Sequence, residues 1–204
     1  MNSTSYRMSF TTGGLYRTEA LKLTESFLRL GDWAKTGHAA QSHNLLQARA
    51  FSTAQRVIRE VVYRLQRLST EELHLLLEGD PQEQSALLWI AVCRRYPFIG
   101  EFATEVLRER FLSLQPDLNY EHYDAFFNRK SDWHPELEKL SQATRKKLRQ
   151  VLFKILKEAD LLVDGHLINP PLLSARLLDT LSPNTRHQDV SYFPIFDADL
   201  RKLA

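Results

Sequence analysis

The chain of 204 residues has a single cysteine and no long apolar run, and both absences exclude classes of protein. Cys93 on its own can form neither an internal disulfide nor a cysteine-rich zinc site. It ends the apolar run Leu87–Cys93, so we expect an inert core thiol in a reducing compartment. No run approaches the roughly 18 apolar residues of a membrane span, and Met1–Phe10 lacks an apolar signal core. We therefore expect a soluble, cytoplasmic protein without a membrane partner.

Glycine is also scarce, and this leaves little room for phosphate-binding loops. The seven glycines form neither a Walker-type nor a dinucleotide-binding motif. The seven histidines are scattered and make no metal-ligand spacing with an acidic neighbour. Nothing selects a hydrolytic triad. The sequence therefore favours a binding protein over an enzyme, and it predicts no cofactor and no metal.

A strong excess of charge of one sign is missing as well. The 27 lysines and arginines face 25 aspartates and glutamates, which leaves a formal charge of +2. The content of 43% hydrophobic and 25% charged residues is ordinary for a globular protein. A nucleic-acid partner must therefore be argued from where the cations lie along the chain.

What the chain has throughout is helical periodicity, which predicts a compact all-α fold. We expect Ser52 to cap one helix, and Ser69 with Glu72 to form a capping box for the next. Gly79-Asp80-Pro81 ends that helix and begins another. The segment 36–44 shows no clear period. The expected helices cover residues 18–30, 52–68, 69–78, 82–96, 98–114, 120–128, 135–140, 143–162, 172–181 and 197–202.

Gln115-Pro116-Asp117 is the best candidate for a boundary between two subdomains. We expect an N-terminal helical subdomain over residues 1–115 and a C-terminal one over 116–204. Each contains one predicted helix-turn-helix element, a geometry that places a helix in the major groove of DNA.

In the first subdomain, the helix 52–68 carries cations opposite its apolar residues. Arg56, Arg59, Tyr63 and Arg67 fall on one outer stripe, with Arg64 at its margin. Between residues 49 and 67 five arginines face only Glu60, a local charge of +4. Arginine suits bidentate contacts with phosphate and guanine. The acidic block at residues 71–83 either neutralises these arginines or confines binding to one face.

In the second subdomain, the segment Trp133–Pro171 reads as a short helix, a turn and a long basic helix. Between residues 145 and 160 six cations face Glu158 and Asp160, again +4, and most lie near the start of the helix. A solvated helix face is the plain alternative to nucleic-acid contact. Phe153 projects from the polar side, which indicates a covering element or partner.

The residues that follow this helix, Val163–Ile168, resemble two short strands around an Asp-Gly turn. Such a hairpin behind a recognition helix is a wing, with His166 near its tip. A plain connector that ends at Pro170-Pro171 is the alternative.

Several stretches together resemble the small BrxA proteins of bacteriophage-exclusion (BREX) defence systems. The stretches are Tyr6–Leu15, Glu25-Ser26, Asp32-Trp33, Arg49–Leu68, Leu87–Tyr96, His134–Leu137 and Thr144–Leu162. The resemblance implies an all-helical, monomeric protein with two helix-turn-helix elements that binds double-stranded DNA in phage defence. It also implies partners among the other components, including the methyltransferase. A likeness to a helical RNA-binding antitermination factor keeps RNA open.

The helix faces, and not the resemblance, supply the predicted contact residues. We expect binding mainly to phosphate through Arg49, Arg56, Arg59, Tyr63, Arg67, Arg145, Lys146, Lys147, Arg149 and Lys154. Two alternatives stay open: an RNA-binding helical module, and a protein adaptor that docks through Phe153 and the aromatic tail Tyr192–Phe196. Packing of that tail on the protein's own core is the plain interpretation.

Overall fold

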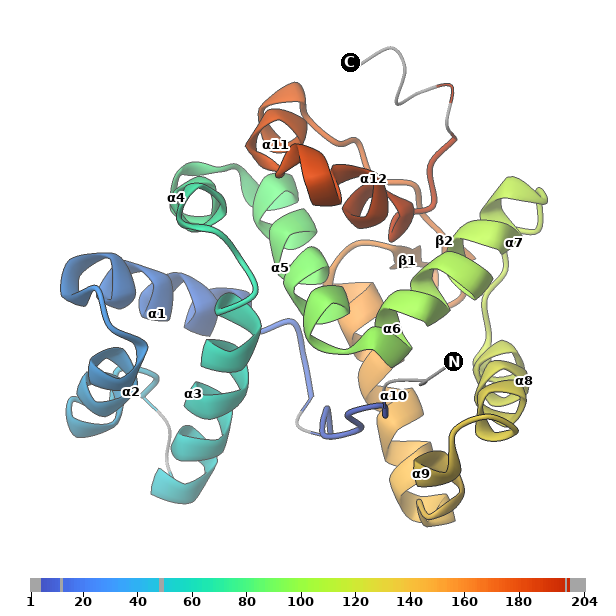
Figure 1. Ribbon diagram of the computed structural model, residues 1–204, viewed down its shortest axis with the longest axis horizontal. Coiled ribbons are helices and arrows are strands. Elements are labelled where there is room, and N and C mark those ends of the chain that lie inside the picture. The colour runs from blue at the N-terminus through green and yellow to red at the C-terminus, as the bar shows by residue number, and fades with distance from the viewer. Residues whose placement is uncertain (1–4, 12, 48–49, 197, 199–204) are drawn as a thin grey trace.

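The computed structural model describes residues 5–11, 13–47, 50–196 and 198, and helices dominate it (Figure 1). The all-α prediction is confirmed. The expected helix at 197–202 falls almost wholly outside the described residues. The helices are α1 (Arg17–Leu30), α2 (Trp33–Ser42), α3 (Phe51–Leu65), α4 (Thr70–Glu78), α5 (Pro81–Arg95), α6 (Pro97–Phe102), the π-helical η1 (Ala103–Arg108), α7 (Glu109–Leu112), α8 (Tyr120–Ser131), α9 (Pro135–Glu138), α10 (Gln142–Glu158), α11 (Ala175–Thr180) and α12 (Pro183–Ser191).

Two of the predicted helix starts are confirmed and one is wrong. Ser69 and Glu72 form the expected capping box of α4, and Asp80 caps α5 with Pro81 in its first turn. The start of α3 differs, because the helix begins at Phe51, one residue before the predicted cap Ser52. Ser52 therefore lies inside the first turn, exposed, and α3 has no side-chain cap.

Two helices lie where the sequence showed no helical period or was not assigned, α2 and α12. The Asp32 carboxylate accepts a hydrogen bond from the Lys35 amide at 2.7 Å and starts α2. The Trp33 ring stacks on Phe27 of α1, with ring centroids 3.8 Å apart. The helix has two buried residues, Thr36 and Ala40, and it packs against α1 and α3.

The hydrophobic core is centred on α5. Every side chain from Leu87 to Cys93 is buried, and the Trp89 indole donates a hydrogen bond to the Tyr192 carbonyl at 3.0 Å. Burial raises the pKa of the Cys93 thiol, as an inert core cysteine requires. The core cluster takes residues from both predicted subdomains. Among the described helices, none is both long and apolar enough to cross a lipid bilayer.

The N-terminal segment, described at residues 5–11 and 13–15, joins the two halves of the molecule. Phe10 is fully buried. The Gly14 carbonyl accepts a hydrogen bond from Arg64 of α3 at 2.7 Å, and the Leu15 amide donates one to Glu158 of α10 at 2.5 Å. In Figure 1 this segment runs between α3 and α10. It passes close to α10, since a Cβ atom on Gly13 would lie 2.9 Å from Val151.

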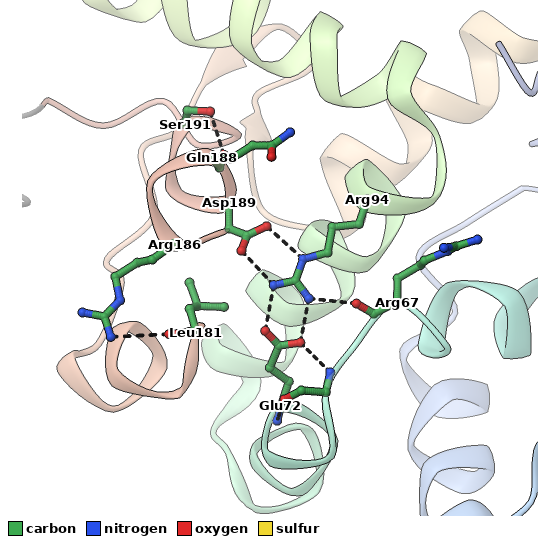
Figure 2. A network of polar contacts seen from close by, with 9 residues as sticks. Arg67, Glu72, Arg94, Leu181, Arg186, Gln188, Asp189 and Ser191 are labelled. Carbon is green, nitrogen blue, oxygen red and sulfur yellow. Dashed lines mark hydrogen bonds and ion pairs between the residues drawn. The ribbon is translucent and has the colours of Figure 1, made fainter. Parts of the chain in front are cut away.

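A buried ion-pair network fixes α4, α5 and α12 together (Figure 2). The Arg94 guanidinium binds both carboxylate oxygens of Glu72 at 2.7 Å and both of Asp189 at 2.9 and 2.7 Å. Burial by itself lowers the pKa of Arg94, but these hydrogen bonds outweigh burial and raise it. Arg94 and Asp189 are 95 positions apart in the chain, so this contact depends on the tertiary fold.

Candidate nucleic-acid interface

The outer stripe predicted for α3 is present and exposed. Ile58, Val61 and Leu65 of α3 are buried, so the opposite face, with Arg56, Arg59 and Tyr63, turns to solvent. Arg67 is also exposed, in the turn after the helix. Its carbonyl accepts a hydrogen bond from Arg94 at 2.8 Å, while its guanidinium points away from that network (Figure 2).

One arginine of α3 does not belong to this surface. Arg64, which the sequence placed at the margin of the stripe, is only 3% exposed. Its guanidinium donates to Glu60 at 2.7 Å and to the Gly14 carbonyl at 2.7 Å. Arg64 and Glu60 therefore neutralise each other within the segment 49–67. Through its bond to Gly14, Arg64 also holds the N-terminal segment against α3.

The acidic block at residues 71–83 does not neutralise the α3 stripe in the part of the chain that the structure describes. Glu72 binds Arg94, and Glu78 pairs with Arg176 at 2.7 Å. Asp80 and Glu83 form a capping box at the start of α5. Of the two alternatives, pairing with the outer-stripe arginines is not seen among the described residues, and local capping or other ion pairs engage Glu72, Glu78, Asp80 and Glu83.

Arg49 cannot be placed, because it lies outside the described residues. Arg56 and Arg59, but not Arg67, line a cleft of about 480 Å³ between α3 and the N-terminal segment. We call it the arginine cleft. It is lined by Arg7, Ser9, Arg56, Arg59, Tyr63 and Arg95, together with Thr11 and Glu60.

Arg7 and Arg95 are cleft residues that the sequence did not single out. Arg7 lies in a segment without helical period, and Arg95 follows the apolar run of α5 as one of two adjacent arginines. In the sequence, Arg94 and Arg95 follow the apolar run of α5, and such a charged pair commonly marks the point where a helix reaches the surface. Arg95 is instead 8% exposed.

On α10 the two lysines near the helix start are exposed as predicted. Lys146 and Lys147 have no ion pair with a described residue, and they lie opposite the buried Leu148, Val151 and Leu152 stripe. Lys154 is partly neutralised by Glu158, at 3.6 Å one helical turn later. Two lysines are thus the uncompensated cations among the predicted contacts of this helix.

The two predicted arginines of α10 form contacts within the protein. Arg145 binds the carbonyl and carboxylate of Asp124 in α8 at 3.0 and 3.3 Å, and Arg149 pairs with the same carboxylate. Each guanidinium also covers an aromatic ring at 4.4 Å, Phe127 and Tyr120 respectively. These contacts fasten α8 to α10 and leave both arginines less than a third exposed.

The hairpin after α10 is confirmed. Strands β1 (Leu162–Val163) and β2 (Leu167–Ile168) pair antiparallel, with Asp164 and Gly165 at positive φ in the turn. The segment 116–118 binds its other edge, since the Leu118 amide donates to the His166 carbonyl at 2.7 Å. Because Asp160 also has a positive φ, α10 ends at Glu158, four residues before the predicted end.

The side chains proposed as adaptor contacts are mostly buried. Phe153 is 3% exposed, and the Tyr120 ring of α8 covers it edge-on at 4.7 Å. Tyr192, Phe193 and Ile195 of the tail pack into the core. The covering element of Phe153 is therefore α8, and these four side chains are not available as docking contacts. Phe196 of the tail is 38% exposed, with its ring 4.8 Å from that of Phe111.

The fold and the site define an all-α protein with exposed cations on two helices and a basic cleft beside one of them. Among the described residues, no group of three acidic, histidine or cysteine side chains could hold a metal ion. The BrxA family model matches residues 4–185. The chain therefore belongs to the BrxA family.

Similarity to curated proteins covers about two thirds of each chain. A BREX protein BrxA of Escherichia coli O9:H4 (strain HS) is 28% identical over 147 residues, 72% of this chain and 69% of that protein. The BREX protein BrxA of Paramagnetospirillum magneticum is 25% identical over 128 residues, 63% of this chain and 64% of that protein. An uncharacterized protein from Magnetospirillum magneticum has a similar fold, with a TM-score of 0.76, 19% identity and coverage of 92% and 97% of the two chains.

Proposed function

We propose that the protein is a non-enzymatic, double-stranded DNA-binding component of a BREX-type phage-defence system. The observation that carries this proposal is the exposed face of α3, where Arg56, Arg59 and Arg67 have no carboxylate partner among the described residues. Uncompensated guanidinium groups on one helix face bind phosphate and guanine, and they bring a polyanion to the surface.

The arrangement around α10 supports a second contact element. The short α9 precedes α10 after a three-residue connection, and the hairpin β1–β2 follows it. This order of short helix, long helix and hairpin is that of a winged helix-turn-helix, in which the start of the long helix meets DNA. Lys146 and Lys147 lie there, exposed.

In the first half of the molecule, α1 and α2 pack together and both pack against α3. A three-helix unit of this kind presents its third helix to the major groove in many DNA-binding proteins. We therefore assign α3 as the recognition helix of the first element, and we place the protein, as a monomer, among other BREX components that include a methyltransferase. The BREX assignment rests on the names of the relatives.

The test is the affinity for a short duplex measured by fluorescence anisotropy across a salt series. We expect log affinity to fall linearly with log salt, by ~0.9 per phosphate neutralised. Charge reversal of Arg56, Arg59 and Arg67 to Glu should abolish binding, whereas Arg29→Glu, on an exposed position of α1, should have a small effect.

Two results would contradict the proposal. One is a duplex affinity that the α3 charge reversal leaves at the level of the Arg29→Glu control. The other is stronger competition by a structured RNA than by an equal concentration of unlabelled duplex, which would make RNA the partner.

A further inference from the structure

Arg95 is a buried cation with no anionic partner among the described residues. It is 8% exposed, its Nε makes no hydrogen bond to a described residue, and no described carboxylate pairs with it. Its guanidinium carbon lies 4.7 Å from the Tyr63 ring centroid and 5.8 Å from that of Tyr96. Cation–π contacts offset part of the cost of burying a charge, but they do not use the guanidinium hydrogens.

Arg64 of the same region is 3% exposed and differs from Arg95 in having an anionic partner. It donates to the Glu60 carboxylate and to the Gly14 carbonyl, although its Nη2 makes no hydrogen bond to a described residue. Glu60 is also the one acidic residue that lines the arginine cleft, and its oxygens accept from Arg64 and from the Tyr96 hydroxyl at 2.7 Å. Arg64 therefore compensates the charge of Glu60, and the Glu60 carboxylate does not serve as the counter-ion of Arg95.

The other charged residues that line the arginine cleft are four arginines. Arg7, Arg56 and Arg59 are exposed at its walls, and Arg95 is the most buried of the four. Four guanidinium groups against one compensated carboxylate concentrate positive potential in a concave space. The hydroxyl groups of Ser9 and Thr11 add neutral donors beside them.

We propose that the arginine cleft is a phosphate-binding site, in which Arg95 and the three outer arginines hold a phosphate group. The planar guanidinium matches phosphate through two parallel hydrogen bonds. A volume of about 480 Å³ is in the range of small-ligand sites. It accommodates a nucleotide or one projecting phosphate, but not the width of a duplex.

The phosphate has two possible sources, a free nucleotide and the backbone of bound DNA. For the second source the inference rests on the proposed function, because the cleft shares Arg56 and Arg59 with the exposed face of α3. The two sources are separated by measuring phosphate and DNA binding on the same variants.

The experiment uses the full chain with inorganic phosphate and adenosine 5′-monophosphate as probes. Melting temperatures are compared in phosphate and chloride at equal ionic strength and pH, and the nucleotide is titrated by calorimetry. We expect both probes to stabilise the wild type. Arg95→Gln and Arg7→Ala should each lower the affinity at least about tenfold, while Arg29→Ala should match the wild type.

Arg7→Ala keeps the test decisive if Arg95→Gln fails to fold, since Arg7 is exposed. Loss of duplex affinity in the same variants identifies the DNA backbone as the source. Loss of nucleotide binding with duplex affinity unchanged, or with no duplex binding at all, identifies a free nucleotide and leaves the cleft assignment intact. The inference would be overturned if the probes did not stabilise the wild type and Arg7→Ala had no effect on duplex affinity.

Discussion

Helices α3 and α10 both carry cations opposite an apolar stripe, but they differ in what lies next to those cations. Around α3, the nearby carboxylates are used elsewhere: Glu60 holds Arg64, and Glu72 holds Arg94. Around α10, Asp124 of α8 binds both arginines that the sequence counted as free. Equal local charge in the sequence therefore becomes unequal free charge on the surface.

The difference predicts that α3 contributes more to DNA affinity than α10. Arg56, Arg59 and Arg67 changed together to Ala should weaken duplex binding roughly 100-fold near 0.1 M salt and lower the salt slope by ~2.7. Lys146 and Lys147 changed to Ala should cost about tenfold and lower the slope by ~1.8. Anisotropy titrations of both variants give the two quantities, and a larger slope change for the α10 variant would reverse the comparison.

The comparison can be sharpened by releasing the arginines of α10. Asp124→Asn should free Arg145 and Arg149 for phosphate and raise duplex affinity about threefold to tenfold. It should also lower the free energy of unfolding by about 1 kcal/mol, because Asp124 is about a third exposed and the pairing is partly screened. Urea unfolding measures the stability.

The control for this variant is Asp132→Asn, which removes the same charge from an exposed position after α8. If both variants raise the affinity equally, net charge is responsible and Arg145 and Arg149 were not released.

A smaller effect is expected at the far end of the basic face of α10. Lys154 is already partly neutralised by Glu158, so Lys154→Ala should change duplex affinity by about twofold. A tenfold loss in the same anisotropy assay would show that Lys154 makes a full phosphate contact and that the ion pair opens on binding.

The smallest expected effect concerns pH and the start of α8, the helix that supports α10. Burial, and then Arg110, lower the pKa of His122, whose Nδ1 accepts a hydrogen bond from the Asn119 amide at 3.0 Å. Asp117 and Glu121 oppose this shift. Because the folded-state pKa lies below the unfolded value of about 6.5, the unfolded chain binds more protons in this window.

Stability from His122 is thus complete above pH ~6.5 and is lost as the pH falls toward the folded-state pKa. Urea unfolding between pH 7 and pH 5 should show this loss, and His122→Gln, which keeps a capping side chain that does not titrate, should reduce it. An identical pH dependence in both proteins would exclude His122 as its origin.

Much of the local structure followed from short-range rules. The capping box of Ser69 and Glu72, the break at Pro97 and the hairpin around Asp164-Gly165 each depend on residues within a few positions of one another. The two helices that were not predicted, α2 and α12, have few buried side chains, so their apolar period is weak. The Asp32 cap and the contact of Trp33 with Phe27 support α2, and the ion pair of Asp189 with Arg94 holds α12.

The candidate site was only partly predictable, because helix periodicity is a local property and several side-chain partners lie far away in the chain. Periodicity identified Arg56, Arg59, Tyr63, Lys146 and Lys147 as outward-facing, and the structure agrees. It did not show that Arg64 bonds the Gly14 carbonyl, or that Arg145 and Arg149 pair with Asp124, because these partners lie on other segments. Arg7 and Arg95 meet across 88 positions, a separation that no spacing rule reaches.

The sequence by itself determined the all-α class, several helix ends and the existence of two basic amphipathic helices, since a helix period and its caps are local properties. Only the tertiary structure decided which cations remain free. Ion pairs such as Arg94 with Asp189 and Arg149 with Asp124 form between groups far apart in the chain. Their formation depends on how the core brings helices together, and the same packing placed Arg95, buried and without an anionic partner among the described residues, beside the exposed face of α3.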